Sequence, residues 1–399
     1  MKKNYFMLAA ATMMFAACAE TDLVNEIAVE ETPQAISFET FANKATRAEN
    51  SDKDYTWDLS DHHTTFSVWG YKDVATTAKV FNGVTVSYAN SVWDYVTNDV
   101  SAVYWDKAAS KYEFYAAAPT KASFWTLVAN TDDQADDYFT TAEFTVESHN
   151  AANSYVESAT QSFKEVNNAE DLMIAEKTTV NKPTNSTFSG NVPLNFIHIL
   201  SRLNVTVKTS IANVTVTKIE VGNINSKGTF NENGTFSEDV AKLTDAAIKA
   251  GTTQRWKLVE AITVTDDAST TTTPAPVISY INSTSKALTA NADAIIAIEA
   301  LVMPQTAGTE TIDINATTFT EKVEPYLYIE YKINSEEYKR AYNLADAFKG
   351  SATTATPVAF NEGWQNTLNL TIGGDKITFT GNVALWADGA TNFGGTTIQ

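Results

Sequence analysis

Cysteine and histidine are scarce in this chain of 399 residues, which contains one cysteine, Cys18, and four histidines. A single thiol excludes an internal disulfide. Two of the histidines, His62 and His63, are adjacent, so on a strand they would point to opposite faces and could not bind one metal ion. We therefore expect no metal and no cofactor.

Basic residues are also few relative to acidic ones. The chain has 28 Lys and Arg against 48 Asp and Glu, which gives a formal net charge of −20. An acidic surface repels phosphate groups, so we expect no nucleic-acid partner. The acidic stretch 132–137, followed by Glu143, loosely resembles a calcium loop, but Asp137 stands where the turn glycine belongs. We interpret that stretch as a solvated acidic loop.

Motifs of common enzymes are missing. The sequence has no Gly-x-Ser-x-Gly elbow, no His-Glu-x-x-His, no phosphate loop and no candidate cysteine nucleophile. Carboxylates are numerous, but abundance alone does not indicate a glycosidase. We predict that the protein is not an enzyme and has no catalytic residue.

Long apolar runs are confined to the first residues. Lys2 and Lys3 precede an apolar run over residues 5–15, followed by two alanines and Cys18. The run is too short to span a membrane and is typical of a signal peptide. Residues 15–18 resemble the lipobox of bacterial lipoproteins, although Phe15 departs from the usual Leu or Val. We expect residues 1–17 to be removed and Cys18 to carry a lipid.

Strand periodicity dominates the rest of the chain. Strict alternation of apolar and polar residues predicts strands over residues 203–208, 327–333, 368–372 and 377–379. Turn residues at 373–375 predict that the last two strands form a hairpin. Only short stretches, such as 238–248, have helical spacing. Many short antiparallel strands predict an all-β protein of two β-sandwich domains with few short helices.

Turn-forming residues within 178–190 suggest the domain boundary. We predict an N-terminal sandwich over residues 48–185 and a C-terminal sandwich over 186–399, both of ordinary domain size. The threonine-rich segment 269–274 is interpreted as a long surface loop of the second domain.

Six segments, in order, resemble the fimbrillin-like family, the subunits of type V pili of Bacteroidia-type bacteria. They follow the lipoprotein signal and are ANKATR at 42–47, VYW at 103–105 with YEFYAAAP at 112–119, DLMIA at 171–175, FIHILSRLNVTV at 196–207, LVMPQ at 301–305 and the closing stretch 363–386. The resemblance implies transthyretin-like sandwiches, a lipid anchor in the outer membrane before assembly, and other pilus subunits as partners at the cell surface. From the residues alone, the aromatic side chains of these segments are core residues, and His198 is a buried histidine.

The resemblance also implies proteolytic cleavage between Arg47 and Ala48, which would free residues 18–47 as a leader. Residues 35–41 alternate and could form a strand with either of two faces inward. Losing that strand would leave an open groove and an unpaired sheet edge. We expect about four large apolar side chains to be buried there, worth on the order of 6–12 kcal/mol before ordering costs.

A strand from another subunit would fill such a groove, and because this contact does not close on itself it would build a filament. The candidate donor strand is the C-terminal one, with the apolar residues Ile377, Phe379, Val383, Leu385 and Trp386. Its alternative role is an ordinary edge hairpin of its own domain. The alternative function is a lipid-anchored adhesin or pilus-tip protein that binds a glycan or a host or bacterial surface protein. A mature N-terminus at Ala48 indicates the subunit, whereas an acylated Cys18 indicates the permanent anchor.

Overall fold

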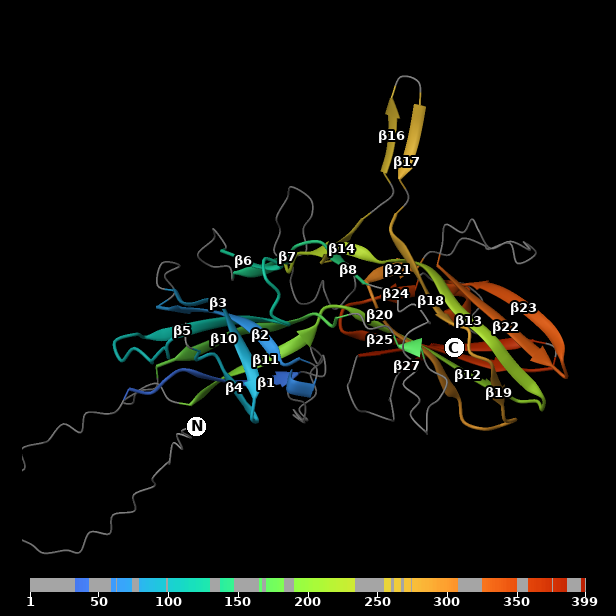
Figure 1. Cartoon of the computed structure of the whole chain (residues 1–399), viewed down its shortest axis with the longest axis horizontal. Coiled ribbons are helices and arrows are strands. Elements are labelled where there is room, and N and C mark those ends of the chain that lie inside the picture. Colours follow the sequence, from blue (N-terminus) through green and yellow to red (C-terminus); the bar gives the residue numbers. More distant parts are fainter. Residues whose placement is uncertain are drawn as a thin grey trace, which may run out of the picture.

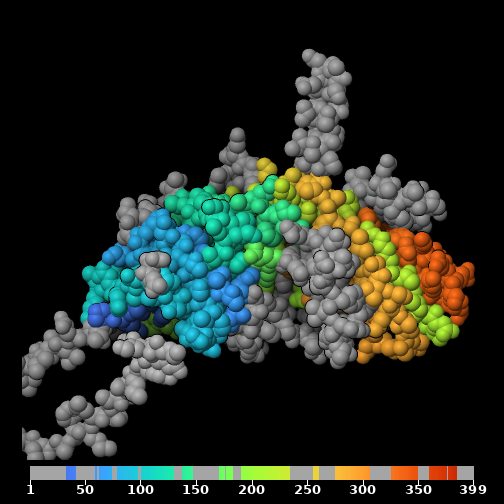
Figure 2. Space-filling view, in the orientation of Figure 1, coloured from blue at the N-terminus to red at the C-terminus, as the bar shows by residue number. Residues whose placement is uncertain are grey.

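A computed structural model of the chain describes residues 33–42, 59–61, 63–73, 79–97, 100–129, 137–146, 165–166, 170–182, 190–233, 255–259, 262–266, 269–273, 275–307, 325–349, 358–374, 376–385 and 396–398. Strands from the first half of the chain lie at one end of an elongated body, and those from the second half lie at the other (Figures 1 and 2). The predicted all-β fold is confirmed, with one α-helix, α2 (Leu344–Lys349), and one short 3-10 helix, η1 (Leu59–Asp61), among the described residues.

A seven-stranded sheet forms the N-terminal half. Its strands, in spatial order, are β1 (Ser37–Ala42), β11 (Asn191–His198), β10 (Met173–Asn181), β5 (Lys111–Ala118), β2 (Thr65–Lys72), β3 (Lys79–Ala89) and β4 (Val92–Asp94). Every neighbouring pair is antiparallel except β1 and β11, which are parallel. The first strand of the described chain therefore lies at the edge of this sheet.

The centre of this sheet is apolar on both faces. In β2, Phe66 and Val68 contribute to one hydrophobic cluster, and Trp69 and Tyr71 contribute to another. A strand covered on both sides reads as a nearly continuous apolar run, as β2 and β5 do. The first cluster is the one that β1 joins, and the second continues into the C-terminal half.

Two larger sheets form the C-terminal half. The six-stranded sheet runs β27 (Thr396–Ile398), β26 (Ile377–Leu385), β25 (Trp364–Ile372), β12 (Ser201–Thr209), β20 (Ile295–Val302) and β9 (Glu165–Val166). The five-stranded sheet runs β18 (Val277–Asn282), β13 (Val214–Asn225), β22 (Tyr326–Ile333) and β23 (Glu336–Asn343), with β19 (Lys286–Leu288) also paired to β13. Leu203 and Val205 of the first sheet share one core with Leu327 and Ile329 of the second, which is the arrangement of a sandwich.

Four predicted strands are confirmed, because residues 203–208, 327–333, 368–372 and 377–379 lie in β12, β22, β25 and β26. The predicted hairpin is confirmed as well, since β25 and β26 pair antiparallel from Trp364 and Leu385 to Ile372 and Ile377. The stretch 238–248 lies outside the described residues.

Small sheets complete the fold. They are β14 (Lys227–Phe230) with β15 (Trp256–Leu258) and β8 (Phe144–Thr145), β6 (Trp125–Val128) with β7 (Tyr138–Thr141), β21 (Gln305–Ala307) with β24 (Val358–Phe360), and β16 (Ile262–Asp266) with β17 (Ser269–Thr273). The prediction that the threonine-rich segment 269–274 is a loop is wrong. Most of the segment is strand β17, which pairs with β16 in a hairpin that projects from the body (Figure 1). Threonine is β-branched and suits an extended backbone.

The chain changes sheets after β11. Residues 191–198 follow the predicted domain boundary at 185 and 186, yet they pair with β1 and β10 in the N-terminal sheet. Residue Ser201 then begins β12 in the C-terminal half. Division into two sandwiches stays a prediction, and a cut that keeps β11 with its partners would fall at residues 199–200. No helix in the described part of the chain is long and apolar enough to cross a membrane.

Candidate functional site: the groove filled by β1

Strand β1 presents its even-numbered side chains to the core. Ile36, just before the strand, is 1% exposed, and Phe38 and Thr40 are each 4% exposed. Glu39 on the opposite face is exposed. The sequence allows either face to turn inward, and the structure selects the one that carries Ile36 and Phe38.

Aromatic rings form the floor beneath Phe38. Its ring lies edge-on to four others, with centroid distances of 6.1, 5.4, 5.9 and 5.9 Å to Phe66, Phe81, Tyr95 and Phe114. Edge-to-face pairs of this kind contribute attraction beyond simple burial of area. We call the space that β1 occupies over these four rings the β1 groove.

Backbone hydrogen bonds hold both β1 and the residues just before it. On one side β1 pairs in parallel with β11 from Ser37 and Asn191 to Ala42 and Phe196. On the other side the Ile36 N–H donates to the Val103 carbonyl at 2.8 Å, and the Gln34 carbonyl accepts from Trp105 N–H at 3.0 Å. β1 thus pairs with β11, and residues 34–36 just before it pair with the segment 103–105, so removal of residues 34–42 would leave unpaired backbone on both of these walls.

Tyr95 links β1 to the wall at 103–105. Its hydroxyl accepts the Val103 N–H at 3.0 Å, and its hydrogen can be donated to the Ile36 carbonyl at 3.0 Å or the Val103 carbonyl at 3.3 Å. The side chain is buried, and this burial raises the pKa of the Tyr95 hydroxyl. Tyr95 therefore remains a neutral donor at neutral pH.

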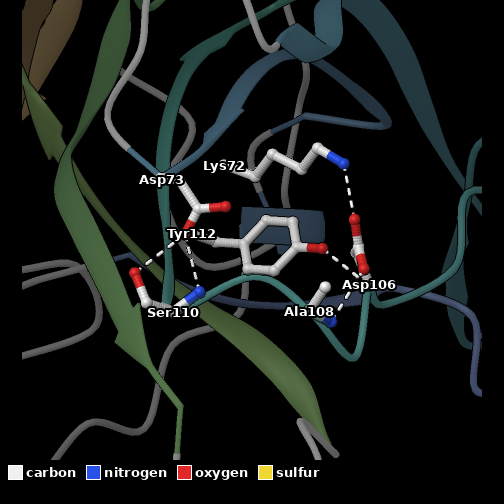
Figure 3. Close-up of polar contacts among 6 residues, drawn as sticks. All are labelled: Lys72, Asp73, Asp106, Ala108, Ser110 and Tyr112. Carbon is white, nitrogen blue, oxygen red and sulfur yellow. Dashed lines mark hydrogen bonds and ion pairs between the residues drawn. The ribbon is translucent and has the colours of Figure 1, made fainter.

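A polar cluster anchors the loop that follows this wall (Figure 3). The Asp106 carboxylate accepts from Lys72 Nζ at 2.6 Å and from the Ala108 N–H at 2.8 Å, while the Tyr112 hydroxyl accepts the Asp106 N–H at 2.7 Å. The hydrogen bond from Lys72 lowers the pKa of Asp106, and the same bond raises the pKa of Lys72. Both strands β2 and β5 thus fix the start of the loop.

Asp73 anchors the end of the same loop. Its Oδ1 atom accepts from the Ser110 N–H at 2.6 Å and from the Ser110 hydroxyl at 2.8 Å. The bond from the Ser110 backbone lowers the pKa of Asp73. Because these contacts involve no atom of β1, they can keep the wall in place when β1 is absent.

The predicted processing residues lie outside the described part of the chain. This applies to Cys18, to Arg47 and Ala48, and to Trp386 of the candidate donor strand. The structure does describe β1, which ends at Ala42, upstream of Arg47. The groove is therefore filled by the segment that cleavage after Arg47 would separate from the rest of the chain.

Most of the candidate donor strand is described and lies in its own sheet as β26. Its inward face carries Ile377, which is buried, and Phe379 and Val383, which are half-buried. Leu385 ends the strand. One neighbour is β25, over nine residue pairs, and the other is the three-residue edge strand β27.

The described residues contain no group of three or more His, Cys, Asp or Glu side chains that could hold a metal ion. The stretch 132–136 lies outside them.

The expected burial of His198 is confirmed, since its side chain is 1% exposed and its Nδ1 lies 2.7 Å from Asp171 Oδ2. This pair lies where the chain leaves the N-terminal sheet, so we assign it a structural role. The arrangement at the β1 groove is suited to binding an extended strand.

Sequence reasoning missed the residues that hold the wall. Tyr95 carries no local signal, because its partners Ile36 and Val103 are identified only by the fold. Asp106 had a usable signal, since an aspartate that accepts the N–H two residues later is a common turn. The core positions of Trp105, Tyr112 and Phe114 were predicted and are confirmed.

Comparison with protein families gives one match: a family model described as fimbrillin-like covers residues 46–386. Solved structures with a similar fold include a fimbrial protein from Bacteroides vulgatus, at 15% identity over 88% of this chain and 99% of that one, with a TM-score of 0.43. The fimbrial anchor protein Mfa2 from Porphyromonas gingivalis aligns at 9% identity over 92% and 99% of the two chains, with a TM-score of 0.29. A search of curated proteins finds no match.

Proposed function

Since the chain belongs to the fimbrillin-like family, we propose that it is a structural subunit of a type V pilus on the bacterial surface. In this proposal it is exported as a lipoprotein precursor, cleaved between Arg47 and Ala48, and polymerised by strand addition. The family supports a role in a pilus or in adhesion, and the geometry of the β1 groove favours the polymerising subunit.

One observation carries the proposal: a separable strand completes the core of the N-terminal sheet. β1 lies upstream of residues 46–386, the stretch that matches the family model, and upstream of Arg47. Once it leaves, the rings of Phe66, Phe81 and Phe114 lose their cover, and both walls lose backbone partners. A strand from a second copy restores both kinds of contact.

The energetic drive is smaller than the sequence suggests. Two large apolar side chains, Ile36 and Phe38, are deeply buried, where about four were expected. At about 1.5–3 kcal/mol each, they give a gross gain on the order of 3–6 kcal/mol, an upper value because the unfolded chain already buries some surface. The backbone pairing with β11 and with residues 103–105 adds to this gain.

Cleavage is tested by replacing Arg47. In an Arg47→Ala protein the leader stays attached, β1 keeps filling its own groove, and we expect monomers on cells with no sheared filaments. Arg340→Ala is a matched control, because Arg340 is an exposed arginine on β23 in the mature region. Mass spectrometry of surface-sheared material reports the N-terminus. Filaments built from Arg47→Ala chains with an intact leader would contradict the proposal.

Lipidation of Cys18 accounts for how the precursor is held at the outer membrane before assembly. Since this is the only cysteine, Cys18→Ala removes every possible thioether anchor. We expect the variant to lose incorporation of a labelled fatty acid and to be released or mislocalised. Label that persists in the Cys18→Ala protein would refute lipidation at this residue.

We propose β26 as the donor strand, with Ile377, Phe379 and Val383 on the inserting face and with Leu385 and Trp386 continuing it. Its regular alternation of apolar and outward residues supports this role. In the free subunit β26 pairs with β25, so donation requires the strand to leave a site of its own. The partner class is therefore a second fimbrillin-like subunit, of the same or a related chain.

A further inference from the structure

We infer that β26 of one subunit enters the β1 groove of the next in a single register, with Ile377 in the place of Ile36 and Phe379 in the place of Phe38. The inference rests on the proposed strand addition and makes it specific. The leader would then occupy the groove in the same register as the donor, with the isoleucine and phenylalanine of each strand at the same positions.

The sequence supports the match. An isoleucine two residues before a phenylalanine occurs twice in the entire chain, at Ile36 with Phe38 and at Ile377 with Phe379. Ile36 lies just before β1 and the other three residues lie on strands, and both pairs point into a core. Because side chains on a strand alternate with period two, each pair can fill two successive inward positions of the same groove.

The groove offers the second pair better burial than its own sheet does. In its own sheet Phe379 is half-buried and one ring pairs with it, that of Tyr342, at a centroid distance of 4.6 Å. In the groove Phe38 is 4% exposed and surrounded by four rings. For these two side chains the groove therefore offers more burial and more ring contacts than their own sheet does.

The third inward position explains where the two strands differ. The groove holds Thr40, and the register puts Gly381 there. In its own sheet Gly381 cannot carry a side chain, because a Cβ atom would lie 2.5 Å from the carbonyl oxygen of Phe348 in α2. The smaller residue is thus required at its own site and is tolerated in the groove, since it fits wherever threonine fits.

The outward face agrees with the same register. Ser37 Oγ donates to Asn191 Oδ1 at 2.5 Å across the parallel pair. The register puts Thr378 at this position, where a hydroxyl is again available as the donor. Thr378 and Asn191 are both exposed on their own strands, so neither is needed for packing.

Paired cysteines test the register. Cys18 lies upstream of Arg47, so the mature chain contains no thiol. Asn191→Cys combined with Thr378→Cys places two thiols on directly paired strands, about 4.8 Å apart at the backbone, within the range for a disulfide. Filaments assembled under reducing conditions and then oxidised should yield a ladder of multimers on a non-reducing gel, and reduction should collapse it.

Two matched controls move the second cysteine by two residues in either direction along the outward face, to Lys376→Cys or Thr380→Cys, which are also exposed positions. Each shift moves the thiol by about 6.8 Å along the strand, out of disulfide reach. Single-cysteine variants report on folding and assembly, and should form filaments without ladders.

The outcomes separate the register from the proposed function. A ladder from the Thr378 pair and none from the controls supports the inference. A ladder from a control pair alone overturns the register while strand addition by β26 stands. Filaments that give no ladder with any pair overturn β26 as the occupant of the groove. Failure of processed wild-type chains to form filaments overturns the proposed function itself.

Discussion

Residues 36–38 at the start of β1 and residues 377–379 at the start of β26 share an isoleucine two residues before a phenylalanine, but the two strands differ in how they are attached. β1 pairs in parallel with β11, whose residues come some 150 positions later in the chain, whereas β26 pairs with β25 through a tight turn at Gly373 and Gly374. Parallel strands need a long connection, and a hairpin needs almost none. One cut in the connection after β1 would therefore free it, while β26 remains tethered to the subunit that would donate it.

The difference in burial between Phe38 on β1 and Phe379 on β26 can be tested by replacing each with alanine in the uncleaved precursor. Phe38→Ala should lower the free energy of unfolding of the N-terminal sandwich by about 3–5 kcal/mol, the usual cost for a fully buried phenylalanine. Phe379→Ala should cost less, about 1–3 kcal/mol, because its side chain is half-buried. Urea unfolding followed by tryptophan fluorescence measures both. Equal losses would mean that the two sites bury the ring equally.

The hydroxyl of Tyr95 sharpens the comparison, because it links residue 36 to the segment 103–105, whereas the amide of Asn369 on β25 donates to the Thr380 carbonyl of β26 at 3.2 Å. Tyr95→Phe removes the bridge between Ile36 and Val103 and leaves the partly buried Val103 N–H without its acceptor. We expect a loss of about 1–3 kcal/mol. Tyr104→Phe is the matched control, since Tyr104 is 52% exposed in the same wall. The idea fails if both variants melt alike.

Acid should loosen the wall slightly. The pKa values of Asp73 and Asp106 are lowered below the ordinary 3.8, so their charged forms are favoured in the folded protein. Their contribution is complete above about pH 4 and is lost as the pH falls further through the lowered pKa values. The protection of the Trp105 amide from hydrogen exchange, relative to the intrinsic exchange rate at each pH, should decrease below that pH in wild type. In an Asp106→Asn variant the pH dependence should shrink, and an unchanged profile would argue against this anchor.

Much of the fold was readable from period-two alternation, because side chains of β12, β22 and β25 meet one core on one face. Other features depend on distant partners. The inward face of residues 35–41 could not be chosen from sequence, because Ile36 lies on one face and Phe41 on the other. The choice depends on the aromatic rings under Phe38, which only the fold brings together. Likewise, nothing near residue 40 reveals that its parallel neighbour is β11, and nothing near Tyr95 reveals its carbonyl partner. The candidate donor strand could be chosen from the sequence, but the register proposed for it depends on the burial of Phe38.

The parallel pairing of β1 with β11 also fixes the polarity of whatever replaces it. An occupant that satisfies the same backbone groups has to run in the same direction, so each added subunit takes the same orientation as the one before. A filament built this way has two unlike ends: one exposes an empty groove and the other a strand still unused. The groove end is costly to leave in water, because its aromatic floor is uncovered. Such a filament would be polar, with every subunit added in the same orientation, and a distinct molecule would be needed to cap its groove end.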